Sequence, residues 1–132
     1  MGKEELGQEL HTLSSEAEYA KRHLNHYKIE LGMLLLKIHD VCSMAELEGF
    51  DDISTFNQFL ATIHLNRRRV IQLIDNAEFI RDCEIDKELW QCLDSSVVDM
   101  FRKKNINPLK HWDDILTLSY TDLKQLYGIS NN

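Results

Sequence analysis

Apolar residues recur every three or four positions over the first forty residues of the chain. They are Leu6, Leu10, Leu13, Ala17, Ala20, Leu24, Tyr27, Leu31, Leu34, Ile38 and Val41. Spacings that alternate between four and three place such residues on one stripe of an α-helix, as in a coiled coil. The pattern therefore predicts one long amphipathic helix over residues 8–44.

The pattern leaves two uses of this helix open. Near Leu34 the stripe widens, because Leu35 and Cys42 add a second apolar edge, which is typical of a helix buried in a globular core. The N-terminal part, residues 1–30, is expected to project and to pair with a second copy in a homodimer. The expected dimerisation residues are Leu6, Leu10, Leu13, Leu24 and Tyr27. In the alternative, the whole helix folds back over its own domain.

Two shorter helices are predicted in the middle of the chain. Ser54 is expected to cap a helix that runs through Leu60, after the turn marked by Gly49. Asn66 is expected to cap the next helix, which runs to about Arg81. Two amphipathic helices joined by a short connection are typical of a helix-turn-helix, here over about residues 54–81.

The last third of the chain contains further helix signals. A helix is expected over residues 86–103, with a break at Asp94-Ser95-Ser96. Pro108 suits the first position of another helix. Ser119 resembles the cap of a last short helix, which Gly128 closes. No segment reads as a strand, so the predicted fold is all-α: a long N-terminal amphipathic helix and a compact helical domain over residues 31–132.

Composition narrows the function classes. The chain has 132 residues, 43% of them hydrophobic, and a formal net charge of −7. It has no apolar run of membrane-spanning length and no signal peptide at its start, which favours a cytoplasmic protein with no membrane partner. Three widely spaced cysteines argue against a disulfide framework. The histidines lack zinc-finger spacing, and no phosphate loop or nucleophile motif occurs. We therefore expect no metal, no cofactor and no catalytic residues.

A run of three arginines, Arg67, Arg68 and Arg69, opens the helix that follows Asn66. Cations at the start of a helix oppose its dipole, at a cost of about 0.3–1 kcal/mol per charge. A sequence selected only for stability favours acidic residues there. The run therefore indicates an anionic partner, which can be nucleic acid or an acidic protein surface.

A helical wheel of residues 66–81 assigns roles on duplex DNA. Its buried side is expected to comprise Val70, Leu73, Ile74, Ala77 and Ile80. Arg68 and Gln72 point the opposite way and can read guanine and adenine edges in a major groove. Arg67 and Arg69 lie on the flanks, where they can contact phosphates. Asp75 is expected to repel the DNA backbone unless it accepts a hydrogen bond from a cytosine amine or restrains the side chain of Gln72.

Residues 34–79 resemble the helix-turn-helix segment of phage and plasmid DNA-binding proteins related to ParB-type partition proteins. The resemblance rests on Gly49-Phe50 before the first helix, on the turn Ile63-His64-Leu65-Asn66-Arg67, and on the hydrophobic run that continues the second helix. It implies that Arg67, Arg68, Arg69 and Gln72 contact DNA. The chain departs from the family at Asp75, where a basic residue is usual, and no nucleotide-binding domain precedes the segment.

These observations favour a small sequence-specific DNA-binding protein, a phage or mobile-element transcriptional regulator that acts as a dimer on duplex DNA. The expected DNA-binding residues are Asn66, Arg67, Arg68, Arg69 and Gln72. The alternative is a helical protein-interaction module, an adaptor or an inhibitor of a nucleic-acid enzyme. Such a module would use the long acidic helix and the arginines to bind a protein partner.

Overall fold

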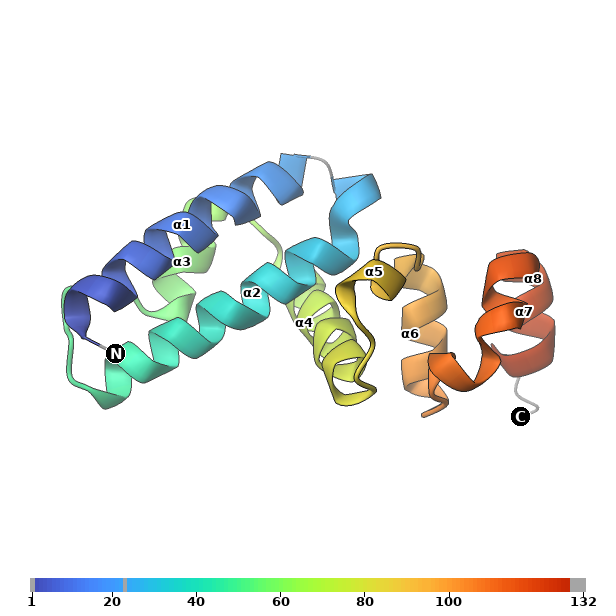
Figure 1. Cartoon of the computed structure of the whole chain (residues 1–132). Coiled ribbons are helices and arrows are strands. Elements are labelled where there is room, and N and C mark those ends of the chain that lie inside the picture. Colours follow the sequence, from blue (N-terminus) through green and yellow to red (C-terminus); the bar gives the residue numbers. More distant parts are fainter. Residues whose placement is uncertain (1, 23, 129–132) are drawn as a thin grey trace. The chain divides into compact units, whose positions relative to one another are not determined.

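The computed structural model describes the backbone of residues 2–22 and 24–128 and the side chains of residues 2–17 and 27–128. Within these ranges the fold is all-α, without strands, which confirms the predicted fold class. The helices (Figure 1) are α1 (Lys3–Arg22), α2 (Leu24–Leu47), α3 (Phe56–Ile63), α4 (Arg67–Asp82), α5 (Lys87–Trp90), α6 (Ser95–Lys103), α7 (Trp112–Thr117) and α8 (Tyr120–Leu123). A 3₁₀ turn, η1 (Pro108–His111), precedes α7, and a π turn, η2 (Lys124–Gly128), follows α8.

The chain divides into two compact units, residues 1–75 and residues 76–132. The boundary falls inside α4, so the first half of this helix belongs to the first unit and the second half to the second. It therefore differs from the division expected after residue 30. None of the described helices is both long enough and apolar enough to span a lipid bilayer.

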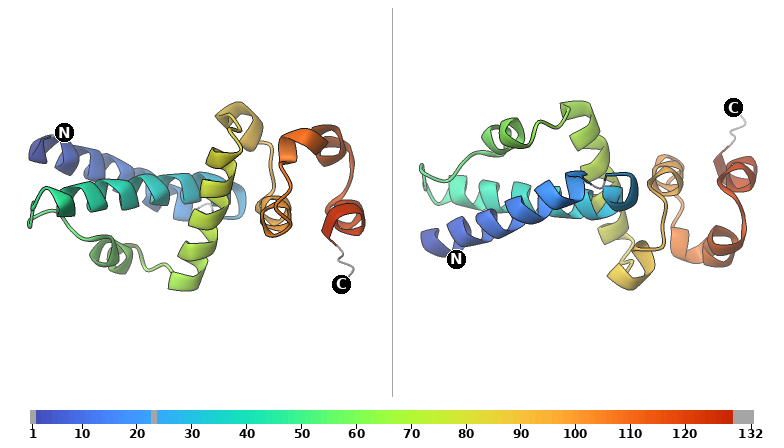
Figure 2. Two further views of the ribbon diagram at one scale, coloured as in Figure 1. Left: turned by 90° about the horizontal axis from the view of Figure 1, so that it is seen from below. Right: turned by 90° about the horizontal axis from the view of Figure 1, so that it is seen from above.

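The N-terminal apolar stripe forms a helical hairpin instead of one continuous helix. α1 and α2 run side by side in opposite directions (Figures 1 and 2) and pack against each other. Leu6 and Ala17 of α1 and Leu31 of α2 are fully buried. The predicted long N-terminal helix is thus present as two helices, α1 and α2, instead of one over residues 8–44, and α1 packs against α2 as in the alternative in which the helix folds back over its own domain. A straight helix would leave its stripe in water, whereas folding back buries both halves of the stripe against each other.

Helix α3 begins at a capping box. The Gln58 amide donates to the Thr55 side-chain oxygen at 3.2 Å, and the Thr55 amide donates to the Gln58 side chain at 2.9 Å. The cap is therefore Thr55 and not Ser54, because only Thr55 has a glutamine three residues later to complete the box. The helix continues to Ile63, three residues beyond the predicted end at Leu60.

The core of the first unit joins all four of its helices. Phe59 and Ile63 of α3 and Val70 and Leu73 of α4 are buried in the same cluster as the facing residues of α1 and α2. Each contributes an apolar side chain at helical spacing, so the short helices are held mainly by packing. This core fixes the start of α4 relative to α3.

In the second unit, short helices surround a separate core. Its buried residues are Val97, Met100, Phe101 and Leu123, with Phe79 of α4 packed against them. The predicted break between α5 and α6 is confirmed, since Asp94 caps α6 by accepting from the Ser96 amide at 2.7 Å. The predicted caps further along are also confirmed: Pro108 begins η1, and Ser119 accepts from the Asp122 amide at 3.1 Å.

Candidate nucleic-acid interface

The side chain of Asn66 caps the start of α4, as predicted. Its Oδ1 accepts from the backbone amides of Arg68 at 2.8 Å and Arg69 at 3.3 Å. These bonds satisfy two amides that have no partner inside the helix, which lets α4 begin at Arg67. The three arginines therefore occupy the first turn of a well-formed helix.

Helices α3 and α4 are joined by only three residues, His64, Leu65 and Asn66. His64 adopts the left-handed conformation, with φ of 54°, which ends α3 and turns the chain. The two helices cross steeply (Figure 2). Two helices joined at a large angle by a three- or four-residue turn form a helix-turn-helix.

The inner side of α4 agrees with the helical wheel. Val70, Leu73, Ala77 and Ile80 are buried, and Ile74 is half-buried. The buried side turns the other face of the first two turns outward. On that face Arg67, Arg68, Arg69 and Gln72 are all exposed.

In the part of the chain that the structure describes, no carboxylate forms an ion pair with the arginine cluster, Arg67 to Arg69. Arg81, in the last turn of the same helix, instead lies 3.6 Å from Glu78 and 3.5 Å from Asp82. The charges of the arginine cluster are therefore directed to solvent at the positive end of the helix dipole.

Two further residues modify this surface. Asp75 is half-buried and lies six positions beyond Arg69, almost two turns from the arginine cluster, so its carboxylate is less prominent than the arginines. Ile71 is 50% exposed and follows Arg67 by four positions and Arg68 by three, on the same part of the helix. The helical wheel assigns Ile71 neither to the buried side nor to the base-reading residues. Its position between these two sets is the sequence signal that could have identified it as an apolar residue on the exposed surface.

The five expected dimerisation residues are placed differently. Leu6 and Leu13 are buried in the core of the first unit. Leu10 and Tyr27 are half-buried and pack against the same core. The side chain of Leu24 lies outside the described side chains. Four of the five residues therefore pack within one copy of the chain.

The three cysteines are free thiols that differ in burial: Cys42 is buried, Cys83 is half-buried and Cys92 is exposed. Burial raises the pKa of the Cys42 thiol, and burial together with the nearby Asp82 carboxylate raises the pKa of Cys83. A raised pKa keeps a thiol protonated and less nucleophilic. Within the described residues, no three His, Cys, Asp or Glu side chains are grouped so as to hold a metal ion.

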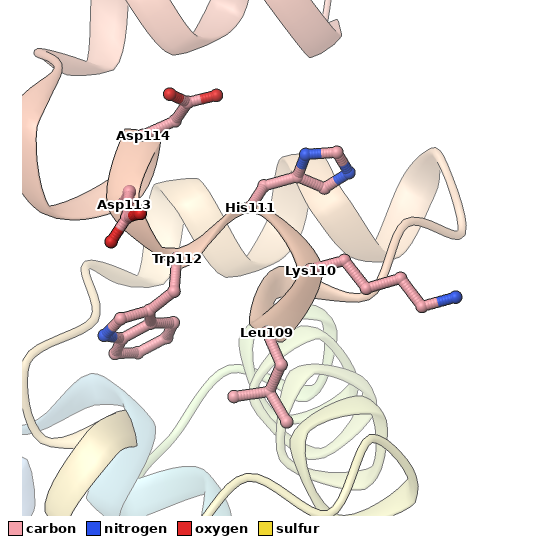
Figure 3. Close-up of a pocket in the computed structure, with 6 residues that line it drawn as sticks. All are labelled: Leu109, Lys110, His111, Trp112, Asp113 and Asp114. Carbon is pink, nitrogen blue, oxygen red and sulfur yellow. The ribbon is translucent and has the colours of Figure 1, made fainter.

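A surface pocket of about 410 Å³ lies along η1 and the start of α7 in the second unit. It is lined by one continuous stretch of chain, residues 109–114, whose side chains leave the backbone in different directions (Figure 3). Next to it, the Tyr127 hydroxyl donates to the Asp114 carboxylate and lies 3.1 Å from His111 Nδ1. These bonds hold η2 against η1 and α7, so we assign them a structural role.

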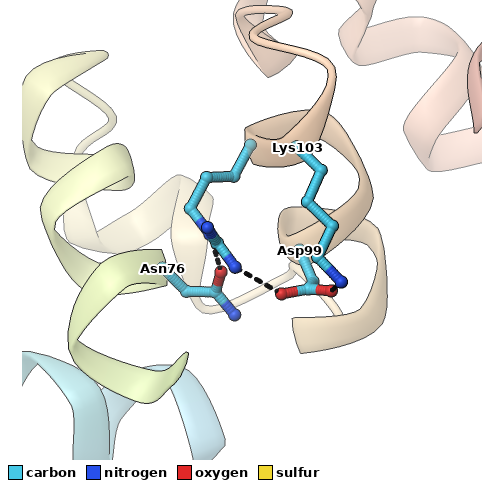
Figure 4. A network of polar contacts seen from close by, with 4 residues as sticks. Asn76, Asp99 and Lys103 are labelled. Carbon is cyan, nitrogen blue, oxygen red and sulfur yellow. Dashed lines mark hydrogen bonds and ion pairs between the residues drawn. The ribbon is translucent and has the colours of Figure 1, made fainter. Parts of the chain in front are cut away.

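A polar network in the second unit joins α4 to α6 (Figure 4). Arg102 Nε donates to the side-chain oxygen of the buried Asn76 at 2.7 Å, and Arg102 Nη2 lies 2.7 Å from Asp99. Lys103 Nζ lies 2.8 Å from the other Asp99 oxygen. Arg102 is thus used inside the unit, which sequence reasoning did not detect because its partner Asn76 lies 26 residues away.

Comparison with known protein families, with curated proteins and with solved structures finds no match to this chain.

Proposed function

We propose that this protein binds duplex DNA sequence-specifically through the start of α4. The observation that carries the proposal is the arginine cluster: three exposed arginines without ion pairs in the described structure, on the first turn of the second helix of a helix-turn-helix. In such motifs the N-terminal residues of the second helix contact base edges in the major groove. The chain's resemblance to phage and plasmid proteins supports a regulator of transcription on phage or mobile-element DNA.

The charge distribution supports specific rather than general DNA binding. The chain carries 22 acidic residues against 15 lysines and arginines, so most of its surface repels a phosphate backbone. Attraction is therefore confined to a few places where cations are concentrated. A protein of this kind depends on local geometry and should show a modest salt dependence, set by few phosphate contacts.

Each of the five expected DNA-binding residues has a proposed role. Arg68 and Gln72 would read base edges, since arginine pairs with guanine and glutamine with adenine. Arg67 and Arg69 would contact phosphates on the two sides of the groove. Asn66 would act indirectly by capping the helix that presents them.

The test is a fluorescence-anisotropy titration at low salt against a random duplex library, followed by selection and sequencing of bound sites. We expect micromolar or tighter binding and recovery of a common motif. Absence of binding at micromolar protein would reject the proposal. Binding without an enriched motif would reduce it to nonspecific DNA association.

A protein-interaction module is the second candidate, because the start of α1 is acidic and exposed and the arginine cluster also suits an acidic protein. A pulldown with and without nuclease separates the two candidates. Partners that are lost after nuclease treatment support the DNA-binding protein. Partners that persist support the protein-interaction module.

A further inference from the structure

A second group of cations gathers around a pocket of the second unit and includes none of the residues assigned to base reading. The pocket has a volume of about 180 Å³ and lies where α6 meets α8 and η2. The polar side chains that line it are Ser96, Asp99, Lys103, Lys104, Tyr120 and Lys124. We refer to it as the lysine pocket.

The lysine pocket carries an excess of positive charge. Asp99 is its acidic lining residue, and this carboxylate is only 15% exposed. Arg102 lies 2.7 Å and Lys103 2.8 Å from the two Asp99 oxygens, so two cations already compensate that charge. Lys104 and Lys124 are both exposed and form no ion pair within the described structure.

The convergence of these lysines is a product of the tertiary fold. Lys104 is the C-cap residue directly after α6, where a cation suits the helix dipole, but Lys124 comes from a different element twenty residues later. The two lysines repel each other because they carry the same charge. The chain has more acidic than basic residues, so carboxylates are plentiful as alternative neighbours for a lysine. Local helix stability therefore explains Lys104 but not the approach of Lys124.

Gly128 of η2 lies close to the Met100 side chain of α6. A Cβ atom on Gly128 would lie 2.5 Å from the sulfur of Met100, so a larger residue at position 128 would require the Met100 side chain to move. Gly128 and Met100 both line the lysine pocket. The hydroxyls of Ser96 and Tyr120 add hydrogen-bond donors beside the ammonium groups.

We infer that the lysine pocket binds a phosphate group. Phosphate oxygens accept hydrogen bonds from ammonium groups and hydroxyls. The group can belong to a nucleic-acid backbone or to free phosphate; the first source rests on the proposed function, whereas the second does not. The site uses different residues from the arginine cluster, so each can be removed separately.

The first experiment tests the site with inorganic phosphate. The amide signals of the full chain are followed by ¹H–¹⁵N NMR during a phosphate titration at constant ionic strength. We expect saturable shifts around Lys104, Lys124 and Gly128 that are lost in Lys104→Gln/Lys124→Gln. The variant Lys87→Gln, an exposed lysine of the same unit outside the pocket, should retain them. Shifts that do not saturate, or that persist in the double variant, would overturn the inference.

The second experiment identifies the source of the phosphate. The salt dependence of DNA affinity is measured for the wild type, the double variant and Lys87→Gln. If the pocket holds one backbone phosphate, the slope of log K against log salt should weaken by about 0.9 in the double variant alone. A saturable phosphate response with an unchanged slope assigns the pocket to free phosphate. If the wild type binds no DNA, the proposed function fails and the phosphate titration still decides this inference.

Discussion

Arg68 is the residue on which the proposed base reading depends most directly. It lies at the centre of the exposed face of α4, and its guanidinium has no ion pair in the described part of the chain. Its neighbours Arg67 and Arg69 have the same charge but lie on the flanks of the helix. The three arginines therefore have the same charge, and their proposed roles differ because of their positions on the helix.

Replacing Arg68 with alanine should weaken binding to the selected DNA site by about 1–3 kcal/mol, which corresponds to roughly 5- to 150-fold. The same change should relax the sequence preference at one base position. Arg67→Ala should instead weaken binding to all sequences alike and reduce the salt slope by about 1, because a phosphate contact is independent of sequence. Anisotropy titrations at several salt concentrations measure both effects.

Arg81→Ala is the matched control, since this arginine is in the last turn of the same helix and is paired with Glu78 and Asp82. It should leave DNA affinity unchanged. An equal loss in Arg81→Ala and Arg68→Ala would show that binding follows net charge, and the assigned reading face would be wrong.

Asn76 is a buried polar residue whose role lies in the stability of the second unit. It is 4% exposed and accepts a hydrogen bond from the Arg102 guanidinium. Because a bond to a charged group contributes about 1.5–3 kcal/mol, Asn76→Ala should lower the free energy of unfolding by a similar amount. Asn57→Ala, at an exposed position of α3, should change it by less than about 0.5 kcal/mol. Urea denaturation checks both values, and equal effects would contradict the assigned role.

The hydrogen bond of Tyr127 should make the free energy of unfolding of the second unit decrease at alkaline pH. Its hydrogen bond to Asp114 raises the pKa of the phenol, because ionisation would remove the donated proton and set two negative charges side by side. A raised folded-state pKa means that the contribution is fully present below the ordinary phenol pKa of about 10 and is lost as pH rises through the folded value. Thermal melts of the wild type and Tyr127→Phe should therefore differ at pH 8 and converge at higher pH. A difference that stays constant to pH 11 would contradict this.

At the scale of the element, the start of α3 shows how a local signal fixes a helix boundary. Thr55 and Gln58 exchange hydrogen bonds in a capping box, whereas the preceding Ser54 is exposed and does not cap the helix. Thr55→Ala should lower the free energy of unfolding of the first unit by about 1 kcal/mol. Ser54→Ala should have an effect below about 0.5 kcal/mol. Chemical denaturation distinguishes them, and a larger loss in Ser54→Ala would restore the cap expected from sequence.

Helix α4 belongs to both units, and its two halves therefore pack into different cores. Its first half carries the arginine cluster outward and Val70 and Leu73 inward to the first core. Its second half contributes Phe79 and Asn76 to the second unit. The proposed reading surface therefore occupies only the first two turns, which agrees with the N-terminal contacts typical of recognition helices.

At the scale of the whole molecule, the internal use of the N-terminal stripe changes the expected oligomeric state. Since Leu6 and Leu13 are buried between helices of one copy, a dimer through them would require the α1–α2 hairpin to open. We therefore expect light scattering of the free protein to give the monomer mass of 15.5 kDa at all concentrations tested. A mass that doubles with concentration would contradict this and favour the homodimer expected from the heptad pattern.

A core substitution completes this test. Leu13→Ala should lower the free energy of unfolding by about 2–5 kcal/mol, as for other buried leucines, with no dependence on protein concentration. Leu47→Ala provides the control, since that side chain is 87% exposed. If Leu13→Ala instead lowers stability only at low protein concentration, the residue belongs to a dimer interface.

The sequence alone determined the features of this protein that depend on neighbouring residues. Periodicity gave the all-α class and the inner side of α4, and local capping chemistry gave the helix starts at Asn66 and Ser119. These signals are readable because the interacting groups are within four residues of each other, so chain connectivity already places them.

Only the tertiary structure decided which distant groups meet. It showed that the two halves of the apolar stripe pair with each other, that Asn76 receives the Arg102 guanidinium, and that Lys124 approaches the end of α6. A heptad stripe is equally satisfied by a second copy or by its own other half, because hydrophobic burial has no direction. The choice between them depends on where the chain turns and on the packing of the whole unit, which periodicity does not encode.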